Sequence, residues 1–96
     1  FLDDAVEACL ASLRKEAKRG SAEIYNISGR DILSLKQLAI KIKKHLNKKN
    51  IKIICKNDFK INYSCLSIDK AIKNLDWLPL HFNNRLKQNI KLWGLN

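Results

Sequence analysis

Apolar residues near the start of the chain recur at the spacing of an amphipathic helix. Asp4, with Glu7 three residues later, marks a helix start, and Gly20 marks an end because glycine readily takes the left-handed conformation that stops a helix. The apolar face would contain Val6, Cys9, Leu10, Leu13 and Ala17. The pattern therefore predicts one complete helix between Asp4 and Gly20.

A second amphipathic helix is predicted to begin at Ser34. Ser34 and Gln37 have the spacing of a capping box, in which each side chain accepts a hydrogen bond from a backbone N–H of the first turn. Apolar positions then follow at helical spacing. They are Leu35, Leu38, Ala39, Ile42 and Leu46.

Two further helices are predicted near the end of the chain. Ser67 can cap a short helix that Pro79 prevents from continuing, since proline lacks a backbone N–H. Asn83 can cap a last helix, which Gly94 would stop. The apolar positions are Ile68, Ala71, Ile72 and Leu75 in the first of these, and Phe82, Leu86, Ile90 and Trp93 in the second.

Two segments have the character of short strands. Residues 23–27 are apolar-rich and run into a turn-like Ser-Gly-Arg-Asp cluster, and residues 51–55 alternate apolar side chains with Lys52. The expected order is α-β-α-β-α-α, without internal repeats or a clear domain boundary. We therefore expect an α/β fold over a single region, residues 1–96.

The net charge of +10 admits nucleic acid, an acidic membrane surface or a phosphorylated ligand as partners. However, fifteen lysines, twelve isoleucines and ten asparagines are what an A+T-rich coding sequence produces without selection for function. We interpret the lysines as a solvated surface, and we expect neither a membrane nor nucleic acid as partner. The absence of methionine and the opening on Phe1 suggest that the chain is part of a longer polypeptide.

The cysteine and histidine residues suggest no special chemistry. Cys9, Cys55 and Cys65 are odd in number and lack a C-x-x-C spacing, which favours small buried hydrophobes in a reducing compartment, the cytoplasm. His45 and His81 share no metal-ligand spacing, so no metal site is predicted. No apolar run approaches the length of a bilayer span.

Leu66 to Pro79, LSIDKAIKNLDWLP, resembles the near-C-terminal signature S-K-A-x-x-x-L-G-W-x-P of NAD-dependent nucleotide-sugar epimerases and dehydratases, which are extended short-chain dehydrogenases/reductases. Other segments resemble the same family in the same order, so that the resemblance covers nearly the whole chain. They are Phe1 to Ala8 (h-V-D-D-v-v-x-A), Tyr25 to Gly29 (Y-N-I-G-x-G), Leu33 to Ala39 (x-S-v-x-e-L-A) and Phe82 to Trp93, the closing helix.

This resemblance implies that residues 1–96 are the C-terminal, substrate-binding fragment of an extended Rossmann-type enzyme. NAD would then bind in an N-terminal lobe that the sequence lacks, and that lobe would be a partner. A UDP-, dTDP- or GDP-sugar would be the ligand. Residues 57–63 would lie nearest to it, with Lys60 and Asn57 as the substrate-binding candidates. In relatives this segment often holds an arginine, whose bidentate fork Lys60 cannot supply to a diphosphate.

The same resemblance implies that the chain has no activity alone and no catalytic residue. The NAD-binding turn G-x-x-G-x-x-G is absent, because Gly20, Gly29 and Gly94 are the only glycines. The Tyr-x-x-x-Lys pair is absent too, since neither Tyr25 nor Tyr63 has a lysine four residues later. The sequence also departs from the family in having Ser28, Asp76 and Arg85 where relatives have glycine.

Two alternatives stay open. The chain could be a small basic module that binds nucleic acid or another polyanion, or it could be a gene remnant without function. The lysines of the basic module would be Lys36, Lys41, Lys43, Lys44, Lys48 and Lys49.

Overall fold

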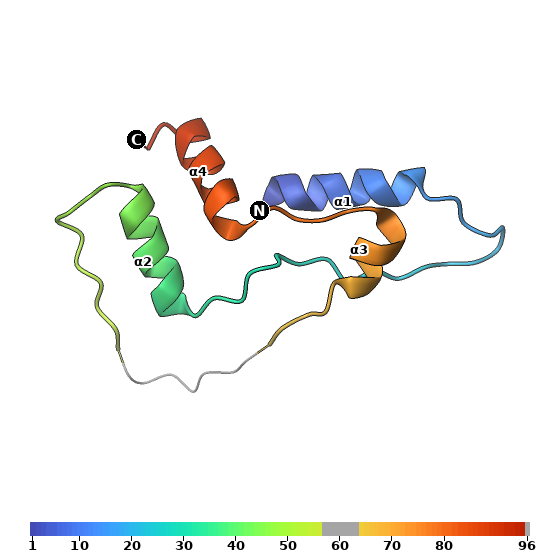
Figure 1. Ribbon diagram of the computed structural model, residues 1–96, viewed down its shortest axis with the longest axis horizontal. Coiled ribbons are helices and arrows are strands. Elements are labelled where there is room, and N and C mark those ends of the chain that lie inside the picture. The colour runs from blue at the N-terminus through green and yellow to red at the C-terminus, as the bar shows by residue number, and fades with distance from the viewer. Residues whose placement is uncertain (57–63, 96) are drawn as a thin grey trace. The chain divides into compact units, whose positions relative to one another are not determined.

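The computed structural model describes residues 1–56 and 64–95, and the regular secondary structure of these residues is entirely helical. The elements are α1 (Leu2–Arg14), α2 (Leu35–His45), α3 (Asp69–Leu75) and α4 (Phe82–Leu92), as Figure 1 shows. The four predicted helices are present. The α/β fold class is wrong for this part of the chain, because the described residues contain no strand.

The chain divides into two compact units. Unit 1 comprises Phe1–Arg30 and Cys65–Leu80, and unit 2 comprises Asp31–Ser64 and His81–Asn96. Each unit therefore joins an early segment of the chain to a late one. Helices α1 and α3 pack together in unit 1, and α2 and α4 pack together in unit 2.

The two predicted strands, residues 23–27 and 51–55, are irregular in the structure. A strand must pair its backbone N–H and C=O groups with a neighbouring strand. Among the described residues, neither segment has a strand beside it to pair with. Alternation of apolar and polar residues suggested a strand, but it could not supply the pairing partner.

The core of unit 1 lies between α1 and α3. Ala8 of α1 and Ala71 of α3 are 3% and 0% exposed, and these small side chains let the two helices approach closely. Ile68, Leu75 and Trp77 complete the buried cluster. Tyr25 and Ile27 pack against it from the segment that follows α1, so the predicted strand contributes to the core without being a strand.

Helix α1 differs from its prediction in its end and in its buried face. It stops at Arg14, and Gly20 takes the expected positive φ (+79°) only in the loop that follows. The buried residues of α1 are Asp4 and Ala8, whereas Val6 and Leu13, on the predicted apolar face, are 48% and 82% exposed.

Two helix ends of unit 2, the start of α2 and the end of α4, agree with the sequence pattern. The capping box is present, with Ser34 accepting from the backbone N–H of Gln37 (3.2 Å) and Gln37 accepting from that of Ser34 (2.8 Å). At the end of α4, Gly94 has φ +65°, and the N–H of Leu95 donates to the carbonyl of Ile90 (3.1 Å). This is the Schellman arrangement, and it confirms that Gly94 ends the helix.

Candidate functional site

The two residues predicted to bind substrate, Lys60 and Asn57, lie outside the described residues. The structure does describe the segments that resemble the epimerase and dehydratase family on either side of them. We therefore take the contacts among those segments as the candidate site.

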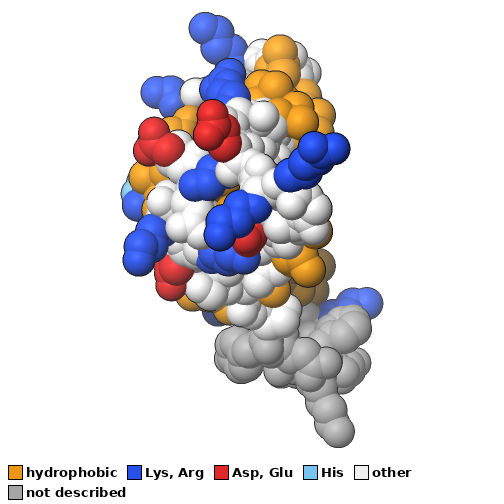
Figure 2. All heavy atoms as spheres, turned by 90° about the vertical axis from the view of Figure 1, so that its right-hand side faces the viewer, with side chains coloured by type: hydrophobic (Ala, Val, Ile, Leu, Met, Phe, Trp, Pro, Cys, Tyr) orange, Lys and Arg blue, Asp and Glu red, His pale blue; other side chains and the backbone are white. Residues whose placement is uncertain are grey.

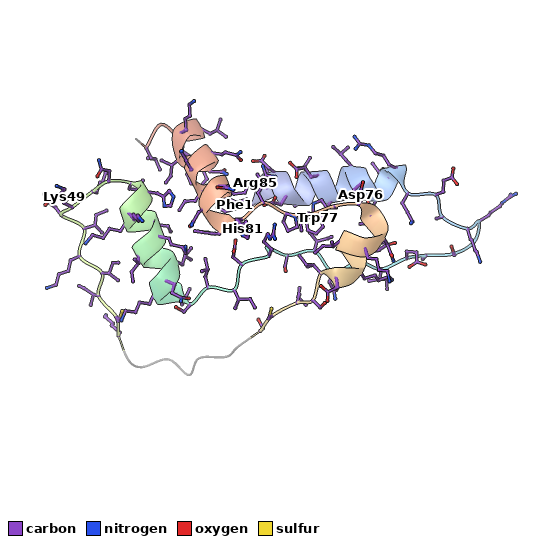
Figure 3. The ribbon with its side chains drawn as sticks, viewed as in Figure 1. Phe1, Lys49, Asp76, Trp77, His81 and Arg85 are labelled. Carbon is purple, nitrogen blue, oxygen red and sulfur yellow. The ribbon has the colours of Figure 1, made fainter. Side chains whose placement is uncertain are left out.

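Asp4 joins the start of α1 to the segment that follows α3. The indole Nε1 of Trp77 donates to the backbone carbonyl of Asp4 (3.2 Å), and the backbone N–H of Leu80 donates to its carboxylate (3.2 Å). Asp4 is 7% exposed and Trp77 is 4% exposed. Figure 3 labels Trp77 in the segment that runs beside α1 after α3. The pattern had assigned Asp4 only to the helix start, because its partners lie far away in the sequence.

Asp76 makes the turn between α3 and Trp77 with a left-handed backbone (φ 50°, ψ 42°). The signature that this segment resembles has glycine at this position, and aspartate here places a side chain in a conformation that glycine adopts at lower cost. The turn ends α3 before Pro79, which is fully buried. Helix α3 has Ile68 at its N-cap, without a side-chain capping bond from that residue. The hydroxyl of Ser67, one position earlier, donates to the carboxylate of Asp69 (3.1 Å) and accepts a long hydrogen bond from the Asp69 backbone N–H (3.5 Å).

Lys70 of α3 holds the segment that resembles Y-N-I-G. Its ammonium group lies 3.0 Å from the carboxylate of Glu23, 2.9 Å from the carbonyl of Ile24 and 4.9 Å from the centre of the Tyr25 ring. Three weak attractions thus converge on one cation, which lies over the Tyr25 ring and connects α3 to the segment of residues 23–25.

A shallow hollow lies between α1 and α3. It is lined by Ala11, Arg14, Lys15, Asn74, Leu75 and Asp76. Its charged groups are two cations and one carboxylate, and it contains no nucleophile paired with a base. In the described residues, no group of three or more His, Cys, Asp or Glu side chains could hold a metal ion. The hollow can attract a small anion, but it has no constellation for catalysis.

In unit 2, Asp31 caps α4 from a distant part of the chain. Its carboxylate accepts a hydrogen bond from the backbone N–H of Phe82 and lies 3.1 Å from Nδ1 of His81. The sequence had suggested Asn83 as the cap, but Asn83 is inside the first turn, where its side chain accepts from Lys41 (3.0 Å). No local signal could have identified Asp31.

Two predictions about burial are wrong. The three cysteines, Cys9, Cys55 and Cys65, are free and exposed, not buried hydrophobes. Trp93, an apolar position of the predicted last helix, is 55% exposed within the described chain, whereas Trp77 is buried.

No protein-family model, curated protein or solved structure matches this chain. None of the helices in the described residues has the length and apolar character that crossing a bilayer requires.

Proposed function

We propose that this chain is the nucleotide-sugar-binding portion of an NAD-dependent epimerase or dehydratase and that it does not catalyse the reaction alone. The observation that carries this proposal is the junction at Asp4. The segment that resembles h-V-D-D supplies a carbonyl and a carboxylate, and the segment that resembles L-G-W-x-P supplies the indole N–H of Trp77. The N–H of Leu80 follows directly after that segment.

Hydrogen bonds at Asp4 connect two of the segments on which the resemblance depends. The first segment of unit 1 supplies the acceptors of Asp4, and the last segment supplies the N–H donors of Trp77 and Leu80, at 3.2 Å in both hydrogen bonds. A chance likeness between separate segments would not require such complementary groups. The burial of Trp77 also explains why an indole, with its large apolar surface and single donor, occupies that position.

The other resembling segments also pack in pairs. Tyr25 and Ile27 belong to the segment that resembles Y-N-I-G, and they lie against the core that contains Trp77. In unit 2, α2 begins with the segment that resembles x-S-v-x-e-L-A, and it packs against the closing helix α4. Both pairings support the view that the segments belong to one inherited arrangement.

In this proposal, residues 57–63 supply the contacts to the ligand. Lys60 neutralises part of the diphosphate as a point charge, and Asn57 offers an amide to a sugar or base. NAD and the catalytic residues belong to the missing N-terminal lobe, because the sequence has neither the glycine-rich turn nor the Tyr-x-x-x-Lys pair. The ligand is a UDP-, dTDP- or GDP-sugar.

Calorimetric titration of the chain with UDP-glucose, dTDP-glucose and GDP-mannose tests the proposal. We expect saturable binding of at least one of them, and Lys60→Gln should weaken it by about tenfold because the diphosphate then lacks one charge-assisted hydrogen bond. Lys18→Gln removes the same charge from an exposed position of unit 1 outside the hollow and should leave the affinity unchanged. If a chain that circular dichroism shows to be helical binds none of the three, the proposal is wrong.

A turnover assay tests the second half of the proposal. The chain alone should show no NAD-dependent epimerisation or dehydration of these sugars above a control without protein. Measurable turnover would contradict the assignment of all catalytic groups to a separate lobe.

A further inference from the structure

The net charge of the chain is confined to one unit. Counted over the sequence, unit 1 has seven basic and seven acidic residues, whereas unit 2 has twelve basic and two acidic residues. Unit 2 therefore carries the whole net charge of +10. The side drawn in Figure 2, where the loop after α1 lies, shows acidic side chains among the basic ones.

Compositional bias does not account for this asymmetry. A bias of the coding sequence acts on the whole chain, but unit 1 contains four lysines and unit 2, of similar length, contains eleven. A compositional bias would place lysines in both units alike, whereas the lysines of this chain are concentrated in unit 2.

In the part of unit 2 that the structure describes, the lysines are not neutralised by neighbouring carboxylates. Among its described residues none of the lysines forms an ion pair, and the only acidic residue, Asp31, is engaged by His81 and by the N–H of Phe82. In unit 1, by contrast, Lys70 pairs with Glu23 at 3.0 Å. Because the electrostatic potentials of separate charges add over a surface, these lysines give the described part of unit 2 a positive potential.

Six of the twelve basic residues of unit 2 lie along one stretch of chain, the lysine run, which we define as Lys43, Lys44, Lys48, Lys49, Lys52 and Lys56. It begins in the last turn of α2 and continues through the turn and the irregular segment that follow. Lys44 and the last four residues of the run are exposed. Lys49 projects from the turn after α2 in Figure 3. Residues 32–57 contain no acidic side chain.

We propose that unit 2 binds nucleic acid by neutralising backbone phosphates with the lysine run. An anionic membrane is less well matched, because a helix that lies on a bilayer needs an unpartnered apolar face. In α2, Leu38 and Ile42 are half-buried in a helix that packs against α4, and helical spacing puts Lys36 and Lys44 on the other side. The apolar residues exposed among these lysines, Ile40, Ile51 and Ile54, are separate positions and do not form one continuous helix face. Duplex DNA has the dense phosphate array that such a site favours.

Fluorescence anisotropy with a labelled DNA duplex of mixed sequence tests this proposal on the whole chain at physiological salt. We expect a Kd of about micromolar, with the logarithm of affinity falling linearly as the logarithm of salt rises. The combined variant Lys44→Gln, Lys48→Gln, Lys49→Gln and Lys52→Gln should bind at least tenfold more weakly. Its salt slope should fall by roughly 3 to 4 units, or about 0.9 for each phosphate that is no longer neutralised.

The matched control takes four positive charges from unit 1 with Lys15→Gln, Lys18→Gln, Arg19→Gln and Lys73→Gln. It should keep the parental affinity within about twofold, because these substitutions remove only a long-range attraction that salt screens. Equal weakening of both variants would overturn the proposal, since the effect would then follow total charge. Stronger binding to phosphatidylserine-containing vesicles than to DNA would also overturn it. Circular dichroism confirms that both variants keep their helices.

Discussion

The indole Nε1 of Trp77 donates a hydrogen bond to the backbone carbonyl of Asp4, seventy-three positions earlier in the chain, at 3.2 Å. The same Asp4 accepts from the N–H of Leu80 through its carboxylate. One buried residue at the start of α1 thus fixes the segment that follows α3. Bringing together two segments so far apart in the sequence costs conformational entropy. We therefore expect the stability of unit 1 to depend on the hydrogen bonds of Asp4, which offset that cost.

Asp4→Ala should lower the free energy of unfolding by about 1 to 3 kcal/mol, since the N–H of Leu80 loses its acceptor in a partly buried place. Urea denaturation followed by circular dichroism measures this change. Glu16→Ala also removes one carboxylate, but at an exposed position, and its effect should stay within about 0.5 kcal/mol. Equal effects of the two substitutions would show that the junction does not stabilise unit 1.

Asp76→Gly should stabilise the chain by up to about 1 kcal/mol. Glycine adopts the left-handed backbone of residue 76 (φ 50°) without strain, and the change also removes a negative charge from the negative end of the α3 dipole. Asp76→Val is the opposing variant, because a β-branched side chain disfavours positive φ. Thermal unfolding should rank Gly above Asp and Asp above Val. A less stable glycine variant would contradict the geometry of this turn.

Asp31→Ala should cost about 1 kcal/mol of stability through loss of the cap on α4. Asn83→Ala is its natural comparison, because the sequence pattern names Asn83 as the cap while the structure assigns that role to Asp31. The exposed bond from Lys41 to Asn83 should contribute less than the cap does. Chemical denaturation of both variants distinguishes the assignments, and a larger loss for Asn83→Ala would favour the sequence pattern.

Gly94→Ala should destabilise the end of α4 by about 1 kcal/mol, because residue 94 has φ +65° and alanine is strained there. Gly29→Ala is the control: Gly29 has no positive φ, and a Cβ added there meets no atom within 4 Å. Hydrogen exchange of the last amides of α4 should speed up only for Gly94→Ala. Similar exchange in both variants would argue against the Schellman end.

The helices were predictable because their signals are local. The capping box at Ser34, the stop at Gly94 and the helical spacing near Ile68 and Leu86 all lie within a few residues of the structure that they determine. The buried face of α1 was not predictable in the same way. Apolar residues occur on two sides of that helix, and only the packing of Ala8 against α3 determines which side is buried.

Long-range partners explain the remaining differences. Whether residues 23–27 form a strand depends on a pairing segment elsewhere, and whether Asp31 caps a helix depends on where Phe82 lies in the fold. The distribution of charge was likewise hidden, because it became visible only when the chain was divided into units. The substrate candidates Lys60 and Asn57 lie outside the described residues, so they stay predictions from the sequence.

The most direct test of the central claim is a titration of the 15N-labelled chain with UDP-, dTDP- and GDP-sugars, followed by two-dimensional NMR. We predict that at least one sugar nucleotide shifts the amide signals of residues 57–63 in a saturable manner, while the indole signal of Trp77, buried in the core of unit 1, does not move. Shifts spread evenly over the lysines, or no shifts with any of the three ligands, would contradict a nucleotide-sugar-binding role.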